Sequence, residues 1–463
     1  MKISKSILLL GLYLCCYNLS FVKGQSWDSV SSGLTNGVLV LFSDTVDNFL
    51  YAGGHFKKAD STILNGIAAW DGNNWNNLGS GMTDCANVCS PVFAIDRYKG
   101  NIYIGGMIAE LDGIQVNGIG KWDGTSWDSL GRGVDGYTTE FLVYNGYLYV
   151  IGTFDSAGNI AANSVAKWDG TSWTDVGLFQ NYGNDYNRLG ALEVYKNEIY
   201  VGGIFYGSDV KPMNIARWDN TNWKSVGQGI KGGLVTVEDF EIYKGYLYVG
   251  GYFLKADGNG GDFIMKWDGS NWSEVGGGTN GEVEDLFVYN NELYAVGNFS
   301  EAGGIPADRF AKWDGKNWCG IGSSFDNTIS AIAEYNNSLF VGGGFWTIDK
   351  DSISHIAKWK GGIDTCSSFS AILDHGLNNA SSMFVYPNPF SVYTTIEIPE
   401  KFQAGSMRLS FALFNLVGTE VKRIENITSD KIKINRDNLP SGLYFYKFTE
   451  MDQIITTGKL SIQ

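Results

Sequence analysis

The sequence is short of basic residues, histidine and proline. It holds 34 Lys and Arg against 49 Asp and Glu, for a net charge of −15, with 3 His and 7 Pro in 463 residues. A nucleic-acid-binding protein needs a basic surface, and this composition excludes one. The 61 glycines follow no triplet repeat, which excludes a collagen-like chain. Because 44% of the residues are hydrophobic, an intrinsically disordered chain is excluded as well.

Long hydrophobic runs are also missing. The most apolar stretch runs from Ile7 to Cys16 and is too short to cross a bilayer. Two lysines precede this stretch, and small residues follow it before Gln25, an arrangement typical of a secretory signal peptide. We therefore expect residues 1–24 to be a signal peptide. We expect the mature protein to lack a transmembrane segment and to be secreted or held at the outer cell surface.

Aromatic side chains and glycine are in excess. The chain carries 15 Trp, 25 Tyr and 26 Phe, beside its 61 glycines. Aromatic residues suit strands and glycine suits tight turns, whereas both are disfavoured in helices. The length exceeds that of one ordinary domain. The composition therefore predicts a large all-β protein.

One motif recurs along most of the chain: an aromatic-rich strand, often Gly-Gly and an aromatic residue, a loop, and Trp-Asp-Gly-x-x-Trp. Its first tryptophan stands at Trp70, Trp122, Trp168, Trp218, Trp267, Trp313 and Trp359. Its second tryptophan stands at Trp75, Trp127, Trp173, Trp223, Trp272 and Trp318. Self-similarity at a period of this size indicates a repeat architecture.

The seventh repeat lacks its second tryptophan, and the missing piece lies near the other end of the chain. The segment around Trp27 closely matches the segment around Trp127. A repeat divided between the two ends of the chain is not expected in a linear array. It is expected in a closed ring, because the first strand can complete the last sheet. We therefore predict a seven-bladed β-propeller over residues 25–366, closed by an N-terminal strand that completes the last sheet.

Each repeat divides into four strands. In the third repeat, residues 141–144 form the inner strand, Asn145-Gly146 supplies a hairpin turn with two residues at positive φ, and residues 148–150 form the second strand. The third strand ends at the first tryptophan and the outer strand begins at the second. This hairpin places the two indoles opposite each other as a cross-strand pair, which is a structural use of tryptophan.

A glycine pair after the second strand, an aromatic-Asp at the end of the third and a Trp in the fourth resemble kelch-type propellers. The repeat length agrees with the kelch period of about 50 residues. The resemblance covers residues 25–366 and implies fold rather than function, because propellers carry many unrelated activities. The three histidines after the signal region, His55, His355 and His375, cannot supply the histidine-rich copper site of kelch-fold galactose oxidases.

The repeats stop at Cys366, and residues 367–382 are small and polar, as in a linker. Residues 383–463 alternate apolar and polar positions between turn residues, which predicts a small immunoglobulin-like β-sandwich. Four stretches in order resemble the C-terminal sorting domain of type IX secretion cargo: Val385–Phe390, Leu413–Val421, Leu439–Lys447 and Gly458–Ile462. The resemblance implies the type IX secretion machinery as a partner and export through the outer membrane. An ordinary accessory domain is the alternative.

Four cysteines follow the signal region: Cys85, Cys89, Cys319 and Cys366. An even count in an exported protein favours two disulfides. Proximity along the chain favours the pairs Cys85–Cys89 and Cys319–Cys366. A metal site is the rival, but the Cys-x3-Cys spacing without nearby histidine supports it poorly.

Carboxylates are the remaining candidates for chemistry, because no Ser/His/Asp arrangement, zinc motif or phosphate loop is present. We expect the position nine residues before the second-strand aromatic to open each inner strand and to line the axial channel. In repeats two to seven it holds Ala94, Glu140, Ala191, Asp239, Asp285 and Ala331, and Glu238 and Glu284 precede two of them. Such acids could hold Ca2+ or hydrolyse a glycoside. The alternative is that they are solvated channel residues or caps of strand ends.

Trp346 is the one tryptophan outside the repeat pattern, and it could stack on a sugar or a partner, or cover a hydrophobic gap. Together these features predict an exported binding module for a glycan or protein ligand. The alternative is an extracellular carbohydrate-active hydrolase or lyase that uses the channel carboxylates. No cofactor is expected, apart from the Ca2+ that the acids could hold.

Overall fold

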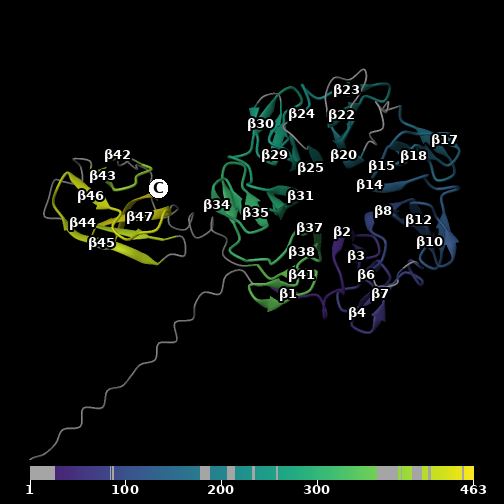
Figure 1. Ribbon diagram of the computed structural model, residues 1–463, viewed down its shortest axis with the longest axis horizontal. Coiled ribbons are helices and arrows are strands. Elements are labelled where there is room, and N and C mark those ends of the chain that lie inside the picture. The colour runs from purple at the N-terminus through teal and green to yellow at the C-terminus, as the bar shows by residue number, and fades with distance from the viewer. Residues whose placement is uncertain are drawn as a thin grey trace, which may run out of the picture. The chain divides into compact units, whose positions relative to one another are not determined.

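The computed structural model describes residues 27–83, 85, 88–177, 188–205, 214–231, 235–256, 259–361, 384–386, 388–398, 409–415, 419–450 and 453–462. The chain divides into two compact units, Met1–Cys366 and Ser367–Gln463 (Figure 1). The predicted signal peptide and linker lie outside the described residues. Throughout the described part the regular structure is β-strand, without helices, as the composition predicts.

The N-terminal unit contains seven four-stranded antiparallel sheets within its described residues. We number them sheet 1 to sheet 7 in the order of their first strands: β2 (Val38–Asp44), β8 (Val92–Tyr98), β14 (Tyr137–Tyr144), β20 (Arg188–Tyr195), β25 (Thr236–Tyr243), β31 (Glu282–Tyr289) and β37 (Ile329–Tyr335). The second strands are β3 (Phe49–Gly54), β9 (Asn101–Gly106), β15 (Tyr147–Thr153), β21 (Glu198–Ile204), β26 (Tyr246–Tyr252), β32 (Glu292–Asn298) and β38 (Ser338–Gly343).

The third strands of the seven sheets are β6 (Ile67–Trp70), β12 (Ile119–Trp122), β18 (Val165–Trp168), β22 (Ile215–Trp218), β29 (Ile264–Trp267), β35 (Phe310–Trp313) and β41 (Ile356–Trp359). The fourth strands are β7 (Trp75–Asn77), β13 (Trp127–Ser129), β19 (Trp173–Asp175), β23 (Trp223–Ser225), β30 (Trp272–Glu274), β36 (Trp318–Gly320) and, for sheet 7, β1 (Trp27–Ser29). Sheet 7 therefore combines strands from both ends of this unit, with Trp27 opposite Trp359.

Short strands outside these sheets pair as hairpins in the loops between second and third strands. They are β4 (Lys58–Ala59), β5 (Thr62–Ile63), β10 (Glu110–Leu111), β11 (Ile114–Gln115), β16 (Ser156–Ala157), β17 (Ile160–Ala161), β27 (Lys255–Ala256), β28 (Asn259–Gly260), β33 (Glu301–Ala302), β34 (Ile305–Pro306), β39 (Thr347–Ile348) and β40 (Asp351–Ser352). β24 (Ile230–Lys231) adds a third strand to the pair β27-β28.

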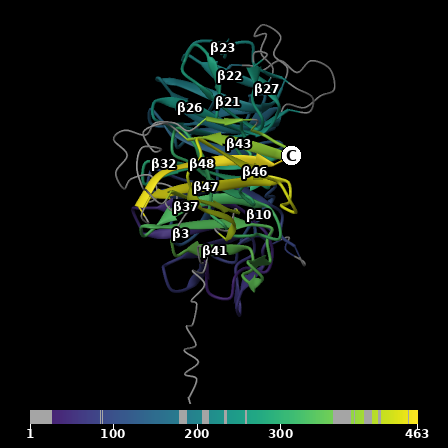
Figure 2. The same ribbon diagram turned by 90° about the vertical axis from the view of Figure 1, so that its left-hand side faces the viewer.

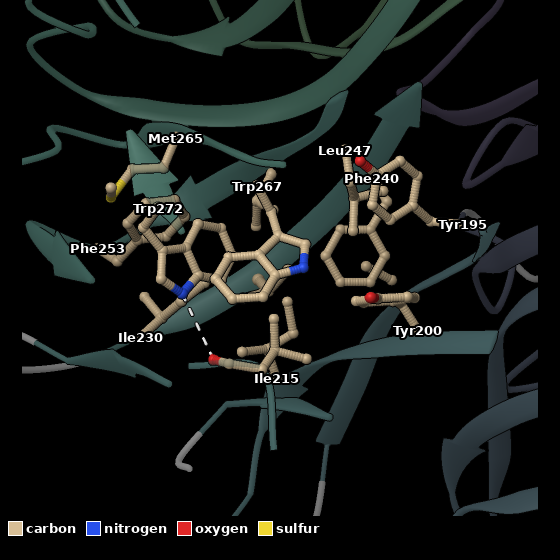
Figure 3. Packing of buried hydrophobic residues seen from close by; sticks show 14 of the residues in the cluster. Tyr195, Tyr200, Ile215, Ile230, Phe240, Leu247, Phe253, Met265, Trp267 and Trp272 are labelled. Atoms are coloured by element: carbon tan, nitrogen blue, oxygen red, sulfur yellow. Dashed lines mark hydrogen bonds between the residues drawn. The ribbon is translucent and has the colours of Figure 1, made fainter. Parts of the chain in front are cut away.

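Two local sequence predictions are confirmed. Asn145 and Gly146 adopt φ of 49° and 80°, the left-handed pair that the hairpin turn requires. The two tryptophans of a repeat lie opposite each other across the third and fourth strands. Trp267 and Trp272, for example, are register partners with ring centroids 5.0 Å apart, and they lie within a buried cluster that includes Phe240 (Figure 3).

The fourth-strand tryptophans also link neighbouring sheets. The indole N–H of Trp127 in sheet 2 donates to the Leu78 carbonyl after the outer strand of sheet 1, at 2.9 Å. The same bond recurs from Trp173, Trp223, Trp272 and Trp318 to the preceding sheet. Each indole is thus both apolar core and a hydrogen-bond donor between sheets, which explains why the repeat keeps tryptophan at this place.

The first strands lie around a common centre (Figure 1). Each contacts the first strand of the next sheet, and β37 contacts β2. From five of the seven sheets, a tyrosine hydroxyl at the end of the first strand donates to the hairpin turn of the following sheet. Tyr98 of sheet 2 reaches the Gly146 carbonyl at 2.7 Å, and Tyr335 of sheet 7 reaches the Asn48 carbonyl of sheet 1 at 3.0 Å. These bonds join the inner edges of neighbouring sheets.

The C-terminal unit holds two sheets that share one core. One is β42 (Phe384–Tyr386), β43 (Tyr393–Glu397) and β46 (Lys431–Asn435); the other is β45 (Glu420–Ile427), β44 (Leu409–Phe414), β47 (Gly442–Glu450) and β48 (Gln453–Ile462). Figure 2 shows β47 and β48 side by side, as their pairing requires. Ile396 and Ile434 from the first sheet and Phe411 and Phe448 from the second are buried in the same cluster.

The predicted disulfide between Cys85 and Cys89 is present. Cys319 is disulfide-bonded too, but Cys366 lies outside the described residues, so the pair Cys319–Cys366 stays a prediction. A search of the described residues for a helix long and apolar enough to span a membrane finds none.

Candidate functional site

A β-bulge interrupts the pairing of the first and second strands in every one of the seven sheets described above. In sheet 3, Thr138 pairs with Gly152 and Glu140 pairs with Ile151, so Thr139 is the extra residue. The corresponding residues of the seven sheets are Leu39, Phe93, Thr139, Gly190, Glu238, Glu284 and Ser330. A bulge re-aims the side chains beside it, and such bulges occur often at binding sites.

The bulges border a central cavity of about 1180 Å³. All seven bulge residues line it, together with residues from the first strand of every sheet. The predicted acids also line it: Glu140, Glu238, Asp239, Glu284 and Asp285. One detail of the sequence prediction is wrong, because the position of Glu140, Asp239 and Asp285 does not open the inner strand. β14 begins at Tyr137, and the acid follows the bulge.

Runs of apolar lining residues and most of the lining acids come from different sheets of the cavity. We call the lining residues Leu39–Phe42, Phe93–Ile95 and Ala331–Ala333, from sheets 1, 2 and 7, the apolar wall. We call Glu140, Glu238, Asp239, Glu284 and Asp285, from sheets 3, 5 and 6, the acidic wall. Along the apolar wall, Leu39, Val40, Leu41 and Phe42 are all partly exposed. Four successive apolar side chains therefore keep accessible surface on a first strand.

Asp239 and Asp285 each accept a hydrogen bond from the next sheet. Oδ2 of Asp239 accepts from the Leu286 N–H at 2.8 Å, and Oδ2 of Asp285 accepts from the Ile332 N–H at 2.8 Å. The two carboxyl groups also influence each other's protonation, because each contributes to the pKa shift of the other. Burial raises the pKa of Asp285 to about 7. Burial, with the charges of Asp285 and Glu140, raises the pKa of Asp239 well above its usual value.

Glu140 approaches these acids from sheet 3. Burial raises its pKa well above the usual value, the charges of Glu193 and Asp285 raise it further, and a hydrogen bond from the Leu192 N–H opposes them. Its Oε2 atom is fully buried and has no hydrogen-bond partner. An unpartnered buried oxygen costs free energy, so this atom stands out among the lining acids.

Three further acids belong to the same electrostatic cluster, and the sequence reasoning missed them. Asp96, Glu193 and Glu241 stand two residues beyond the predicted position in sheets 2, 4 and 5. Burial raises the pKa of Glu241 to about 8 and that of Asp96 to about 6, and it raises the pKa of Glu193 as well. Successive same-face residues in a strand are two apart, so this spacing could have revealed them.

The bulge acids form the outer part of the acidic wall. Burial raises the pKa of Glu284 to about 8, with help from Glu282 and Glu238, and Arg188 opposes this. Arg188 lies 3.7 Å from Glu238 and is about half exposed. It is the one basic residue among the described residues that line the cavity, against seven acids: Asp44, Glu140, Glu238, Asp239, Glu284, Asp285 and Glu334.

Trp346 does not join this group. Its side chain is 54% exposed, it packs edge-on against His355 at 4.2 Å, and it is absent from the cavity lining. Among the described residues, no three His, Cys, Asp or Glu side chains are grouped to hold a metal ion.

Comparison with known proteins identifies the C-terminal unit. Residues 384–463 match the family model described as the secretion system C-terminal sorting domain. These residues are a type IX sorting domain. The sorting domain marks proteins that are secreted or held at the outer surface, and it implies interaction with the secretion machinery.

The other comparisons concern the whole chain. No curated protein matches it. Similar solved structures include two of an extracellular domain from B. thetaiotaomicron, described in one case as part of a putative hybrid two-component system and in the other as part of a putative one-component system. Both are 11% identical over 95% of this chain, with TM-scores of 0.45 and 0.43. The chain spans 60% and 59% of the lengths of those two chains.

Proposed function

We propose that residues 25–366 form a closed, kelch-like, seven-bladed β-propeller in which each four-stranded sheet is one blade. Three observations support closure: the pairing of the N-terminal strand β1 with β41 inside sheet 7, the contact of β37 in sheet 7 with β2 in sheet 1, and the hydrogen bond from Tyr335 in sheet 7 to Asn48 in sheet 1. Residues 367–382 are then the linker, and residues 383–463 an immunoglobulin-like sorting domain that the secretion machinery recognises.

Deletion of residues 25–34 tests closure. The deletion removes β1 and leaves β41 with an unpaired edge, so we expect a large fall in the melting temperature of the mature protein. The control is a deletion of residues 453–463, which removes β48 from the C-terminal unit and should leave the melting transition of the propeller unchanged. An unchanged melting temperature after the first deletion would show that the N-terminal strand does not close the ring.

We further propose that the protein is an exported binding module whose ligand occupies the central cavity. The single observation that carries this proposal is the cavity of about 1180 Å³ bordered by all seven bulge residues. Its volume exceeds what one small ligand needs, and convergent polar groups with perturbed pKa values line one wall. Among the described residues, the acids at the outer turns have lowered rather than raised pKa values, as at Asp123 and Asp219.

A hydrolase that uses the acidic wall is the second candidate. The observation in its favour is that burial raises the pKa of Asp285 to about 7 and raises the pKa of the neighbouring Asp239 well above its usual value, as general acids require. Against it, both carboxyl groups already accept backbone N–H groups of the next sheet. Those hydrogen bonds join neighbouring sheets, so the two acids have a structural role that does not depend on a substrate.

A thermal-shift screen of small molecules and oligosaccharides separates the candidates. We expect compounds that raise the melting temperature of the mature protein, because a ligand of the folded state stabilises it. The shift should vanish in the double variant Asp239→Asn/Asp285→Asn and persist in Glu274→Gln, an exposed acid on β30. Absence of any shift, or equal shifts in the double variant, would contradict the binding proposal. Turnover of an oligosaccharide that the double variant loses would establish the hydrolase.

A further inference from the structure

The two walls of the cavity together define the chemical class of its ligand. We propose that the central cavity binds a small organic cation: a protonated amine whose charged end lies against the acidic wall and whose apolar body lies against the apolar wall. This inference rests on the proposed binding function and specifies it.

Charge is the first argument. Seven acidic residues and one basic residue line the cavity in the described part of the chain, and the basic residue, Arg188, already lies beside Glu238. Asp44 is likewise paired, with Arg97. The remaining acids of the acidic wall have no cationic partner among the ion pairs of the described residues. A low-dielectric cavity lined by one sign of charge attracts ligands of the opposite sign.

Glu140 supplies an independent observation. Its Oε2 is buried without a hydrogen-bond partner, and it is the one carboxylate oxygen among the described residues in that position. An ammonium group offers three N–H donors on one small positive charge, so it could bond to the Glu140 carboxyl group, once that side chain turns Oε2 toward the cavity, and to a neighbouring carboxylate. A metal ion is the poorer candidate, since no three ligating side chains in the described residues are grouped for one.

The apolar wall determines the rest of the ligand. Leu39, Leu41 and Phe42 keep accessible surface toward a cavity that is far larger than one ammonium group. Burying this surface against an alkyl or aryl body is favourable in proportion to the area covered. Aromatic rings at Phe42 and Phe93 on one side and Phe287 on the other also suit a cation, because their faces are electronegative.

Protonation provides a distinctive signature for the site. Asp285, with its pKa raised to about 7, and Glu284, with its pKa raised to about 8, hold protons near neutral pH in the protein without ligand, and burial raises the pKa values of Glu140 and Asp239 as well. A bound cation favours the ionised carboxylates, so its binding must release protons. If one proton is released, the affinity rises about tenfold for each pH unit between roughly pH 6 and pH 8, where an alkylamine stays protonated.

Isothermal titration calorimetry of the mature protein with three matched probes tests the proposal: phenethylamine, neutral 2-phenylethanol and neutral maltotriose. We expect binding of phenethylamine, with proton release revealed by buffers of different ionisation enthalpy. Glu140→Gln and Asp239→Asn should each weaken it at least about tenfold, the cost of one charged hydrogen bond. Leu39→Ala should weaken it about tenfold through the apolar wall. Glu274→Gln is the charge-matched control and should leave the affinity unchanged.

The outcomes separate this inference from the proposed function. If maltotriose or 2-phenylethanol binds in a way that depends on Asp239 and phenethylamine does not bind, the inference of a cationic ligand is wrong. The cavity then remains a binding site, as the proposed function requires. Binding of phenethylamine that Glu140→Gln and Asp239→Asn leave unchanged would place the amine elsewhere and overturn the inference. Absence of binding by all three probes would overturn the inference, and the wider thermal-shift screen then decides the proposed function. Circular dichroism melting of each variant verifies that it is folded.

Discussion

Acidic residues at the outer and inner edges of the sheets experience opposite surroundings. At the outer edge, the aspartate after the first repeat tryptophan accepts two backbone N–H groups of its turn, and those bonds lower the pKa of Asp123 to about 2. At the inner edge, burial raises the pKa of Asp285 to about 7. An aspartate side chain thus stabilises a turn at the outer edge, whereas at the inner edge its ionised form is destabilised by burial.

The difference teaches which residues serve the scaffold and which serve the site. The turn aspartate is present in six sheets, at Asp71, Asp123, Asp169, Asp219, Asp268 and Asp314, and its bonds are the same in each. The inner position varies instead between Val40, Ala94, Ala191 and Ala331 on one hand and the acids of the acidic wall on the other. A feature repeated in six of the seven sheets explains the fold, whereas a feature restricted to a few sheets needs another reason.

The largest expected effect belongs to the scaffold. Trp27 is 8% exposed, packs edge-on against Phe310 and Phe325, and donates its indole N–H to Ser323 at 3.0 Å. Trp27→Ala should therefore lower the free energy of unfolding by about 3–5 kcal/mol, measured by denaturant titration. Trp346→Ala makes the same chemical change on an exposed side chain and should cost less than about 1 kcal/mol. Equal losses in the two variants would remove the distinction between scaffold and surface tryptophans.

The next effect is a pH dependence that the two kinds of acid impose in opposite directions. Between about pH 4, where these acids titrate when unfolded, and their raised folded pKa values of about 6 to 8, the folded protein binds more protons than the unfolded chain. The free energy of unfolding should therefore fall as pH rises from about 5 to about 8. Below about pH 4 the turn aspartates lose their stabilising charge and stability should fall again.

Urea titrations of the mature protein across this range provide the measurement. The variant Asp239→Asn/Asp285→Asn removes two of the inner acids and should show a shallower decline toward about pH 8. A stability that rises steadily from about pH 5 to about pH 8 in the wild-type protein would contradict the raised pKa values.

A smaller effect on stability is expected when aspartate is replaced by asparagine at the outer edge of sheet 6 and, in a second variant, at its inner edge. Asp314 at the outer turn accepts N–H groups of Lys316 and Asn317, both at 2.7 Å, and Asp314→Asn weakens both bonds. It should lower the free energy of unfolding by about 1 kcal/mol. Asp285→Asn keeps an acceptor for the Ile332 N–H and removes a buried charge, so at about pH 8 it should raise the free energy of unfolding by a similar amount. The same sign in both variants would contradict the contrast.

Much of the fold follows from local patterns in the sequence. The spacing of Trp267 and Trp272 indicates their cross-strand pair, and Asn145-Gly146 indicates its turn, because both depend on residues close in the chain. The match between the Trp27 and Trp127 segments also indicates that Trp27 belongs beside Trp359. The strand lengths were less predictable: β14 begins at Tyr137 rather than at Phe141, because the bulge breaks the alternation before Glu140.

The site was predictable only in part. Counting back along each repeat locates Glu140, Asp239 and Asp285, but their coupling depends on contacts among sheets that local spacing does not contain. The sequence does not predict the apolar wall, because Leu39 and Phe42 cannot be distinguished from core residues by their sequence pattern. Whether they face protein or a cavity depends on how sheets that are far apart in the sequence are arranged.

The central claim is that the repeated outer residues build the scaffold and the unrepeated inner residues bind the ligand. Calorimetric titration of phenethylamine into Asp239→Asn and Trp127→Phe tests it most directly. Trp127 donates to Leu78 between sheets, so Trp127→Phe should lower the melting temperature and leave the affinity unchanged. Asp239→Asn should keep or raise the melting temperature, because it removes a buried charge, and it should lose about tenfold in affinity. Loss of affinity in Trp127→Phe together with full affinity in Asp239→Asn would contradict the account.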